Sequence, residues 1–343
     1  MSAQDLDTLK LGEYLAEHIP GFSGPLTAEK FAGGQSNPTF KLSAGGVDYV
    51  LRRKPPGELL KSAHAVDREF RVISALRDTE VPVPRTFTLC EDESVIGSMF
   101  YVMEYLEGRI LWDPSLPDAR DKAERAAIFD SMNATMAALH NVDVDAVGLS
   151  DYGRPGNYFE RQLSRWTKQY RASETKTIAA MEKLLDYLPA NMPEDDGRVS
   201  LVHGDYRIDN LMFEQDGTRC VGVLDWELST IGHPYADLAA VIMQWQMPPG
   251  KEGRGLAGLD RESLGLPSDQ AFIDAYCSKR GLAGIDNFGF YLGFTFFRMA
   301  GILQGVYKRA LDGNASDPAR AKKFGSYVPM FAQHGLAALR STV

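Results

Sequence analysis

The stretch that most constrains this chain lies at residues 201–227, LVHGDYRIDNLMFEQDGTRCVGVLDWE. An apolar start leads to Asp205, and two further apolar runs then flank an Asp-Gly pair at residues 216–217. Such a pair between apolar runs is typical of a tight turn, so we expect the two runs to form an antiparallel hairpin. Because the outer ends of a hairpin lie side by side, Asp205, Asn210 and Asp225 are expected to converge on one small volume.

Two acids and a carboxamide in one volume suit phosphoryl transfer, in which the protein makes few covalent bonds. One Asp can accept the proton of a substrate hydroxyl, while an Asn and a second Asp hold the Mg2+ that bridges nucleotide phosphates. Oxygen atoms are the ligands that Mg2+ prefers. Each residue alone would more simply belong to a hydrogen-bonded surface loop, but the three together at strand ends favour a catalytic site.

A glycine-containing turn precedes this stretch at residues 31–40, FAGGQSNPTF. Gly33 and Gly34 would let the backbone turn sharply and approach a phosphate closely, with the small polar residues Ser36 and Asn37 beside them. A plain hairpin is the alternative, since glycine pairs are common in hairpins. The turn matches neither a Walker A loop nor a GxGxxG dinucleotide fingerprint.

The next two elements predict a cation facing a buried carboxylate. Residues 48–53, DYVLRR, alternate as a strand does, and Arg52 lies on the same face as Val50. In the helix expected over residues 62–76, Glu69 falls on the apolar stripe. Burying an unpaired charge is costly, so Glu69 needs a cationic partner, for which Arg52 or a neighbour is the candidate.

A change from strand-like to helical patterns near residues 104–108 predicts a boundary between two lobes. We expect residues 1–104 to form an N-lobe and residues 105–343 a C-lobe. Glu104 and Leu106 lie in this connector, whose backbone groups could hydrogen-bond a planar base. Helical patterns fill much of the remainder, at residues 125–141, 158–188, 270–279 and 289–311.

Further polar residues follow Asp225 closely. Glu227 would either join the metal shell or serve as a structural acid, and the sequence leaves both open. His233 and Asp237 are expected to fix the loop and the start of the next helix by hydrogen bonds. No histidine spacing favours a zinc site, and no GxSxG elbow supports a serine hydrolase.

Composition excludes several other classes. The formal net charge of −9 argues against a general nucleic-acid binder, which needs a cationic surface. Three widely spaced cysteines offer neither a disulfide framework nor a CxxC metal site, so a reducing cytoplasm is the expected location. No secretory signal is visible, and the apolar stretch at residues 288–303 is too short and polar to span a membrane.

The order of these features resembles the kinase plan, including the five-residue step from Asp205 to Asn210. The runs HGDYRIDNLMF and VLDWELSTIGHPYADLA resemble the aminoglycoside phosphotransferase and choline kinase superfamily. The runs YVLRRKPPG, SAHAVDREFRVISAL and FRMAGILQGVYKRALDGNAS resemble the branch whose kinase domain is fused to the acyl-CoA dehydrogenases 10 and 11. The resemblance implies an α+β, two-lobed, protein-kinase-like fold with a small antiparallel-sheet N-lobe and a mainly helical C-lobe.

The resemblance also implies roles for individual residues, with ATP and Mg2+ as cofactors. Asp205 becomes the catalytic base, and Asn210 and Asp225 become Mg2+ ligands. Glu69 pairs with the phosphate-binding cation, and Arg52 best matches the position that holds Lys in protein kinases. DWE replaces DFG and no APE segment follows, which points to a small hydroxylated substrate rather than a protein.

The branch implies 4-hydroxyacyl-CoA phosphorylation, and any acyl-CoA dehydrogenase partner would be a separate chain. An aminoglycoside, choline-like or sugar kinase is the alternative within the enzyme class. A nucleotide-binding pseudokinase that serves as a scaffold is the alternative of another class, although the three polar residues count against it. An anionic CoA suits the basic character of the late helices, which comes from Arg298, Lys308, Arg309, Arg320, Lys322 and Lys323.

Overall fold

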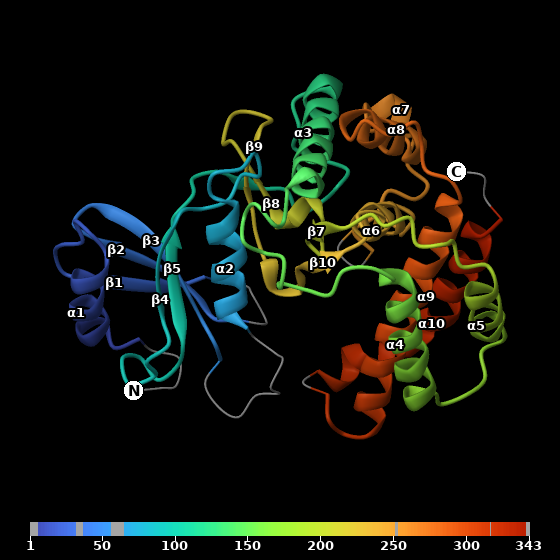
Figure 1. Ribbon diagram of the computed structural model, residues 1–343, viewed down its shortest axis with the longest axis horizontal. Coiled ribbons are helices and arrows are strands. Elements are labelled where there is room, and N and C mark those ends of the chain that lie inside the picture. The colour runs from blue at the N-terminus through green and yellow to red at the C-terminus, as the bar shows by residue number, and fades with distance from the viewer. Residues whose placement is uncertain (1–5, 32–36, 56–64, 251–252, 316, 341–343) are drawn as a thin grey trace. The chain divides into compact units, whose positions relative to one another are not determined.

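The computed structural model describes residues 6–31, 37–55, 65–250, 253–315 and 317–340 (Figure 1). The chain divides into two compact units. Unit 1 comprises Met1–Leu111, Asp145–Leu149 and Asp209–Ser229, and unit 2 comprises Trp112–Val144, Ser150–Ile208 and Thr230–Val343. The units are defined by compactness and differ from the predicted lobes, whose boundary at residue 104 stays a prediction.

An antiparallel sheet of five strands forms the larger part of unit 1, in the order β1-β2-β3-β5-β4. Gly45 and Gly46 both have positive φ, 59° and 80°, and so provide the tight turn that joins the second and third strands. The strands are β1 (Thr27–Lys30), β2 (Thr39–Ala44), β3 (Val47–Arg53), β4 (Thr86–Cys90) and β5 (Phe100–Glu104).

Two helices cover opposite faces of this sheet (Figure 1). Helix α1 (Thr8–His18) buries Leu11 and Leu15 in a cluster with strand residues such as Leu42 and Leu51. Helix α2 (Val66–Leu76) buries Glu69 on the same stripe as its apolar residues, as the sequence predicts. The stripe therefore delivers one carboxylate to the sheet.

Unit 1 also contains the predicted hairpin. Strands β8 (Leu211–Phe213) and β9 (Cys220–Val223) pair antiparallel, with Leu211 opposite Val223. Strand β6 (Arg109–Ile110) pairs with β8 and completes a small three-stranded sheet. Short 3-10 turns at Ile208–Asn210 and Trp226–Leu228 stand at the two outer ends of the hairpin.

Unit 2 is mostly helical. Strands β7 (Ser200–Val202) and β10 (Thr230–Gly232) form an antiparallel pair. Helix α9 is buried along most of its length, and α4, α6 and α10 pack against it. The helices are α3 (Lys122–Asn141), α4 (Tyr158–Ser173), α5 (Ala179–Ala190), α6 (Tyr235–Trp245), α7 (Arg261–Leu264), α8 (Asp269–Lys279), α9 (Phe288–Leu311) and α10 (Pro318–Ala338).

Most of the predicted helices are present, but the pattern over residues 158–188 divides into two. Helix α4 ends at Ser173, and Glu174 adopts an extended conformation with ψ 132°. The β-branched Thr175 and Thr177 follow, and such residues favour extended backbone over helix. A continuous apolar period therefore does not guarantee a continuous helix.

An antiparallel sheet near the N-terminus followed by a mainly helical remainder is the predicted α+β architecture. The three cysteines, Cys90, Cys220 and Cys277, are buried and form no disulfide with one another. Within the described ranges, no helix is long and apolar enough to cross a membrane.

Candidate functional site

The outer ends of the hairpin in unit 1 bring Asn210 and Asp225 together. The Leu224 backbone N–H donates to the Asn210 carbonyl oxygen at 2.9 Å, so the residue before β8 lies beside the end of β9. Asp225 adopts the left-handed conformation, with φ 65° and ψ 60°. This conformation costs a non-glycine residue about 1 kcal/mol or more, and such strain is concentrated at functional sites. The hairpin thus presents Asp225 in a fixed, strained orientation.

Arg52 on β3 connects this hairpin end to helix α2 within unit 1. Its Nη2 lies 2.6 Å from Asp225 Oδ1, and its Nε lies 2.9 Å from Glu69 Oε2. The Glu227 carboxylate is more distant, at 3.8 Å from Arg52 Nη2. The pairing that the sequence predicts for Glu69 is therefore present, and Arg52 is its cation.

The neighbouring Arg53 faces the other way. Its guanidinium lies 5.5 Å from the Phe40 ring centre, and Nη1 donates to the Ile96 carbonyl oxygen at 3.4 Å. Burial lowers the pKa of Arg53. The geometry therefore selects Arg52 over Arg53 as the cation beside the two carboxylates.

Glu69 is 1% exposed and has two further partners that the sequence analysis missed. Asn37 Nδ2 donates to Glu69 Oε1 at 2.8 Å, and the Tyr101 hydroxyl donates to Oε2 at 3.2 Å. Asn37 lies in a loop, and the strand pattern around Tyr101 does not show that its hydroxyl reaches Glu69, so no local signal identifies either partner. The Asn37 side chain is bonded to Glu69, and its phosphate-binding role stays a prediction.

Burial and charge compete at this cluster. Burial raises the pKa of Glu69 to about 7, although the nearby Arg52 guanidinium opposes the shift. For Arg52 burial acts to lower the pKa, but the Glu69 and Asp225 carboxylates outweigh it and the pKa is raised. Burial, followed by the charge of Glu69, raises the pKa of the Tyr101 hydroxyl. Arg52 therefore stays cationic at all ordinary pH values.

The other nucleotide-binding candidates remain predictions. Gly33, Gly34 and Ser36 lie outside the described residues. Glu104 is exposed, and its carboxylate accepts from the Arg85 backbone N–H at 3.1 Å. Leu106 packs closely on Gly222, where an added Cβ would lie 2.5 Å from the Leu106 Cδ1.

Oxygen donors suited to Mg2+ lie at the hairpin end. Asn210 offers a carboxamide, and Asp225 and Glu227 offer carboxylates. Among the described residues, no group of three or more His, Cys, Asp and Glu side chains has the geometry of a metal site. The donor chemistry of Asn210 with one or two carboxylates fits Mg2+, which usually retains several water ligands.

The candidate base, Asp205, belongs to unit 2 and follows β7. Its side chain is 37% exposed, and its Oδ1 lies 3.4 Å from Arg207 Nε, an ion pair that the sequence analysis missed. Gly204, which precedes it, has φ 84°, a conformation that glycine adopts without strain. Because Asp205 and the hairpin end belong to different units, their convergence stays a prediction.

Asp237 at the start of α6 holds the loop that carries Asp205. It is 1% exposed, and its two carboxylate oxygens accept from the backbone N–H groups of His203 at 2.7 Å and Gly204 at 2.9 Å. Burial acts to raise the pKa of Asp237, but the hydrogen bond and charge of His140, followed by the interactions with His203, outweigh it and the pKa is lowered. The sequence predicted that Asp237 would fix the loop after Asp225, whereas its carboxylate holds the loop of His203 and Gly204.

His140 is a further member of this buried network. Its Nε2 lies 3.2 Å from Asp237 Oδ2, and its Nδ1 lies 2.7 Å from the Tyr276 hydroxyl. Burial lowers the pKa of His140, so the neutral imidazole is favoured. Its partners are distant in the chain, so no local pattern identifies this network.

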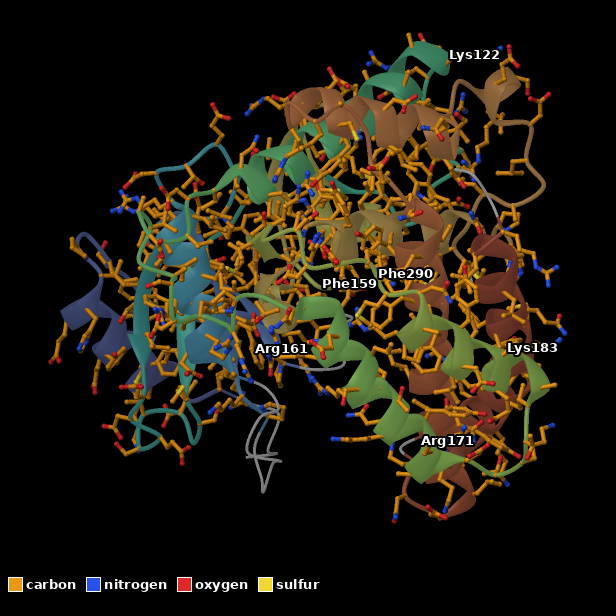
Figure 2. All side chains as sticks on the ribbon, turned by 45° about the vertical axis from the view of Figure 1, so that its right-hand side comes forward. Lys122, Phe159, Arg161, Arg171, Lys183 and Phe290 are labelled. Carbon is orange, nitrogen blue, oxygen red and sulfur yellow. The ribbon has the colours of Figure 1, made fainter. Side chains whose placement is uncertain are left out.

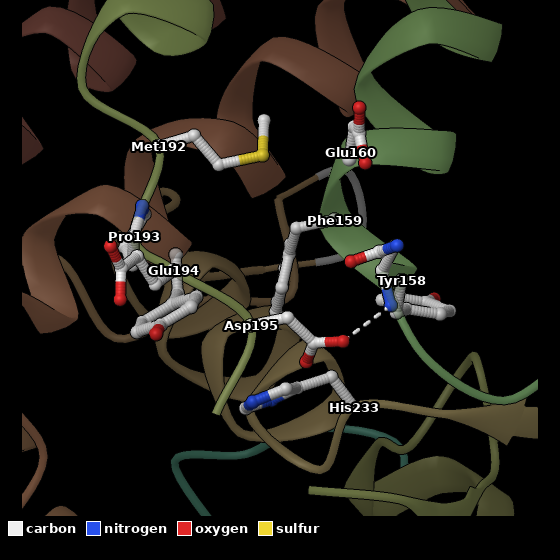
Figure 3. A pocket seen from close by; sticks show the side chains of 10 residues that line it. Tyr158, Phe159, Glu160, Met192, Pro193, Glu194, Asp195 and His233 are labelled. Atoms are coloured by element: carbon white, nitrogen blue, oxygen red, sulfur yellow. Dashed lines mark hydrogen bonds between the residues drawn. The ribbon is translucent and has the colours of Figure 1, made fainter. Parts of the chain in front are cut away.

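A cavity of about 220 Å3 lies next to His233 in unit 2 (Figure 3). Asp195 accepts a hydrogen bond from the Asn157 backbone N–H at 2.7 Å at its edge. His233 stacks on Tyr291 with an interplanar angle of 18° and accepts from the Tyr235 backbone N–H, at the predicted start of a helix. The residues that line this cavity come from segments that are distant in the sequence, so no sequence motif predicts the cavity.

Three comparisons place this chain among known proteins. The model of the phosphotransferase enzyme family matches residues 27–278. Acyl-CoA dehydrogenase family member 10 of Mus musculus is 46% identical over 312 residues, which are 91% of this chain and 29% of that protein. Acyl-CoA dehydrogenase family member 11 of Rattus norvegicus is 42% identical over 342 residues, 98% of this chain and 44% of that protein. The chain thus spans less than half the length of these relatives.

Solved structures share the architecture. A crystal structure from Ralstonia eutropha JMP134, provisionally assigned as an aminoglycoside phosphotransferase, is 49% identical with a TM-score of 0.90 and covers 98% of this chain and 99% of its own. Aminoglycoside phosphotransferase APH(4)-Ia in complex with ADP and hygromycin B is 16% identical with a TM-score of 0.62, covering 97% of this chain and 100% of its own. The latter shows the kinase-like fold alone.

The family model, the relatives and the fold all agree with the resemblance to the aminoglycoside phosphotransferase superfamily. They also support a phosphotransferase that acts on hydroxyl groups. The chain belongs to the phosphotransferase enzyme family, in the branch that includes the acyl-CoA dehydrogenase family members 10 and 11.

Proposed function

We propose that the protein is an ATP- and Mg2+-dependent kinase that phosphorylates the hydroxyl group of a hydroxyacyl-CoA, of the 4-hydroxyacyl-CoA type. The observation that carries the kinase assignment is the bridge from Glu69 through Arg52 to Asp225. In protein kinases a strand cation paired with a helix carboxylate, together with a metal-binding Asp, positions the nucleotide phosphates. Solved neighbours bound to ADP and to AMP-PNP support nucleotide use.

The proposed reaction transfers one phosphoryl group. The substrate oxygen attacks the γ-phosphorus of ATP, the bond from that phosphorus to the bridging oxygen breaks, and ADP leaves. Asp205 accepts the proton of the substrate hydroxyl, and Arg207 and the backbone bonds to Asp237 fix the carboxylate for this task. Bound Mg2+, held by Asn210 and Asp225 with Glu227 nearby, would supply charge neutralisation on the phosphates.

The choice of acceptor is supported by the names of the relatives. Curated relatives are named acyl-CoA dehydrogenase family members, and so a CoA thioester is favoured over other hydroxylated compounds. An acyl-CoA dehydrogenase is the proposed partner, acting on the same class of thioesters. A cytoplasmic location remains a prediction from the cysteine content.

Other acceptors remain testable alternatives. The neighbour from Ralstonia eutropha and APH(4)-Ia carry aminoglycoside names, so an aminoglycoside is the first rival, followed by choline-like compounds and sugars. A pseudokinase scaffold is the rival of another class. It would bind nucleotide without transferring phosphate.

A screen for ADP release tests these proposals together. The acceptors are 4-hydroxyacyl-CoAs, the free hydroxy acids, choline, sugars and aminoglycosides, each with Mg2+ and ATP. We expect turnover with the hydroxyacyl-CoAs and a loss of about 1,000-fold or more in the Asp205→Ala variant, because the proton acceptor is removed. Unchanged turnover in that variant would contradict the role of Asp205.

The acceptor profile decides the substrate class. Turnover with an aminoglycoside alone would overturn the CoA assignment and leave the kinase assignment intact. Nucleotide binding with no transfer to any acceptor would favour the scaffold. The free hydroxy acids serve as the matched control for the thioesters, because they carry the same hydroxyl without the CoA.

A further inference from the structure

A groove along the N-terminal half of α4 carries a concentration of positive charge in unit 2. It encloses about 690 Å3. Arg161, Arg165 and Lys168 recur at intervals of four and three residues, so they lie on one face of the helix. Arg154 adds a fourth cation from the preceding loop, and Glu160 is the one acidic residue among the described residues that line the groove. The groove is therefore cationic although the chain carries a formal net charge of −9.

These cations are not neutralised by the protein. Within the described ranges, none of the four forms an ion pair with a carboxylate. Farther along the same helix, Arg171 behaves differently, because its Nη1 lies 2.7 Å from Glu182 and 3.2 Å from Glu174 (Figure 2). The unpaired charge is thus confined to the half of α4 that faces the groove.

Protein contacts hold some of these guanidinium groups in place. Arg161 Nη2 donates to the Arg154 carbonyl oxygen at 2.5 Å, so a neutral backbone group orients it. Arg165 and Arg298 both lie over the Trp166 ring, at 5.6 Å and 5.7 Å from the ring centres. Arg298, from α9, has a buried Nε with no hydrogen-bond partner among the described residues. Prior orientation lowers the entropy lost when an anion binds.

The groove begins beside the strand pair that leads to the candidate base. Tyr158 is the first residue of α4, and a Cβ at Gly232 would lie 2.8 Å from its ring. Gly232 ends β10 and lies opposite Ser200 at the start of β7, whose other end leads to Asp205. All of these residues belong to unit 2, so the groove and the loop that carries Asp205 are parts of the same compact unit.

We propose that this groove binds the phosphate groups of the acceptor, as the phosphoadenosine end of a CoA thioester. Several closely spaced arginines suit several phosphates, because the guanidinium forms paired hydrogen bonds with phosphate oxygens. A cationic acceptor such as an aminoglycoside would be repelled here. The identification of the ligand as CoA rests on the proposed function, whereas the preference for a polyanion rests on the groove itself.

Charge reversal inside and outside the groove provides the test. The groove variant combines Arg165→Glu with Lys168→Glu, two exposed residues that make no ion pair in the described part of the chain. The matched control combines Lys176→Glu with Lys183→Glu. Both residues are exposed and neither lines the groove, so the control changes the net charge equally. Calorimetry measures the binding of CoA, 3′-dephospho-CoA and pantetheine at fixed ionic strength.

We expect the groove variant to bind CoA about tenfold more weakly or worse, with a smaller loss for 3′-dephospho-CoA and no change for pantetheine. The control should bind CoA within about twofold of the wild type. Equal CoA affinity in wild type and groove variant would overturn the proposal. An equal loss of ATP affinity would also overturn it, because the groove would then serve the nucleotide.

The outcome is separable from that of the proposed function. Phosphorylation of hydroxyacyl-CoA with groove-independent CoA binding would leave the function standing and refute the groove. If CoA binding depends on the groove but no phosphorylation occurs, the groove proposal stands and the proposed kinase function is refuted. As a second readout, the groove variant should retain wild-type turnover on a hydroxyacyl-pantetheine thioester while its KM for the CoA thioester rises about tenfold or more.

Discussion

Glu69 illustrates how one buried residue sets the behaviour of its surroundings. Its carboxylate contacts Arg52, Asn37 and Tyr101, and every one of these contacts links segments that are distant in the chain. Removal of any partner would leave a polar group buried without compensation, which costs about 1–3 kcal/mol for a neutral hydrogen bond and more for a charge. The cluster is therefore expected to behave as a unit.

The pKa of Glu69 predicts a pH dependence of stability. The ordinary pKa of a Glu carboxyl is 4.5, and burial raises that of Glu69 to about 7 in the folded protein. Between these values the folded state binds more protons than the unfolded state, so stability falls as the pH rises from about 4.5 to about 7. The Glu69→Gln variant lacks the titrating carboxyl and therefore lacks this pH-dependent contribution to stability.

The difference in free energy of unfolding, wild type minus Glu69→Gln, should therefore decrease over this interval, by on the order of 3 kcal/mol at most, and be level above pH 7. Urea unfolding at a series of pH values, without added Mg2+, measures it. Parallel pH profiles for the two proteins would mean that Glu69 keeps its ordinary pKa in the folded state.

The sequence predicted Arg52, Glu69 and Asp237 as structurally engaged residues but missed several of their partners. Asn37 is 32 residues from Glu69, and His140 is 97 residues from Asp237. Helical and strand periods report only on which face of an element a residue occupies. They identify a buried carboxylate, but the donor that compensates it comes from a loop or helix that the period does not relate to it.

At the level of elements, the hairpin and most helices followed from local signals. The Asp-Gly pair at residues 216–217 predicted the turn between β8 and β9, and apolar spacing predicted α2, α3, α8 and α9. The interruption between α4 and α5 was not predicted, because the apolar period continues across it. Packing of α9 against its neighbours depends on glycines, which the hydrophobic pattern does not weigh.

Two glycines of α9 should respond oppositely to alanine. A Cβ at Gly293 would lie 2.7 Å from Leu339 Cδ2 and 3.2 Å from the Gly335 carbonyl oxygen, so Gly293→Ala forces α9 away from α10. At Gly305 the nearest atom would be 4.0 Å away. We expect Gly293→Ala to lower the free energy of unfolding by about 1–3 kcal/mol and Gly305→Ala to raise it by about 0.5–1 kcal/mol.

Chemical denaturation measures the free energy of unfolding of both variants. Each variant serves as the other's control because both replace glycine by alanine in one helix. An equal gain from the two substitutions would show that α9 and α10 can separate without cost. The same comparison tests whether close helix packing, rather than helix propensity, decides which residue stands at position 293.

In the whole molecule, the proposed functions are distributed over the two units. Unit 1 holds Arg52, Asn210 and Asp225, whereas unit 2 holds Asp205 and the groove along α4. Nucleotide binding and proton acceptance should therefore respond to different substitutions. The overall α+β architecture was predictable from the family resemblance and from the change of strand-like to helical patterns along the chain. The acceptor site was not, since its residues come from separate segments.

Thermal unfolding with and without Mg2+ and ATP tests this separation. A ligand that binds only the folded state raises the melting temperature. Asp205→Ala should keep the wild-type shift, because it leaves unit 1 intact. Arg52→Lys retains the charge but loses the two-sided contact with Glu69 and Asp225. It should therefore lose most of the shift in melting temperature. The reverse pattern would assign the nucleotide to unit 2.

The left-handed backbone of Asp225 has a consequence for how this position can vary. Glycine would relieve the strain at φ 65°, yet it would remove the carboxylate that faces Arg52. Selection for stability alone would therefore drift towards glycine or asparagine here, and retention of aspartate requires selection for the chemistry. Stability and activity therefore favour different residues at position 225. Among related chains, the residue at this position should distinguish active kinases from inactive relatives that have kept only the fold.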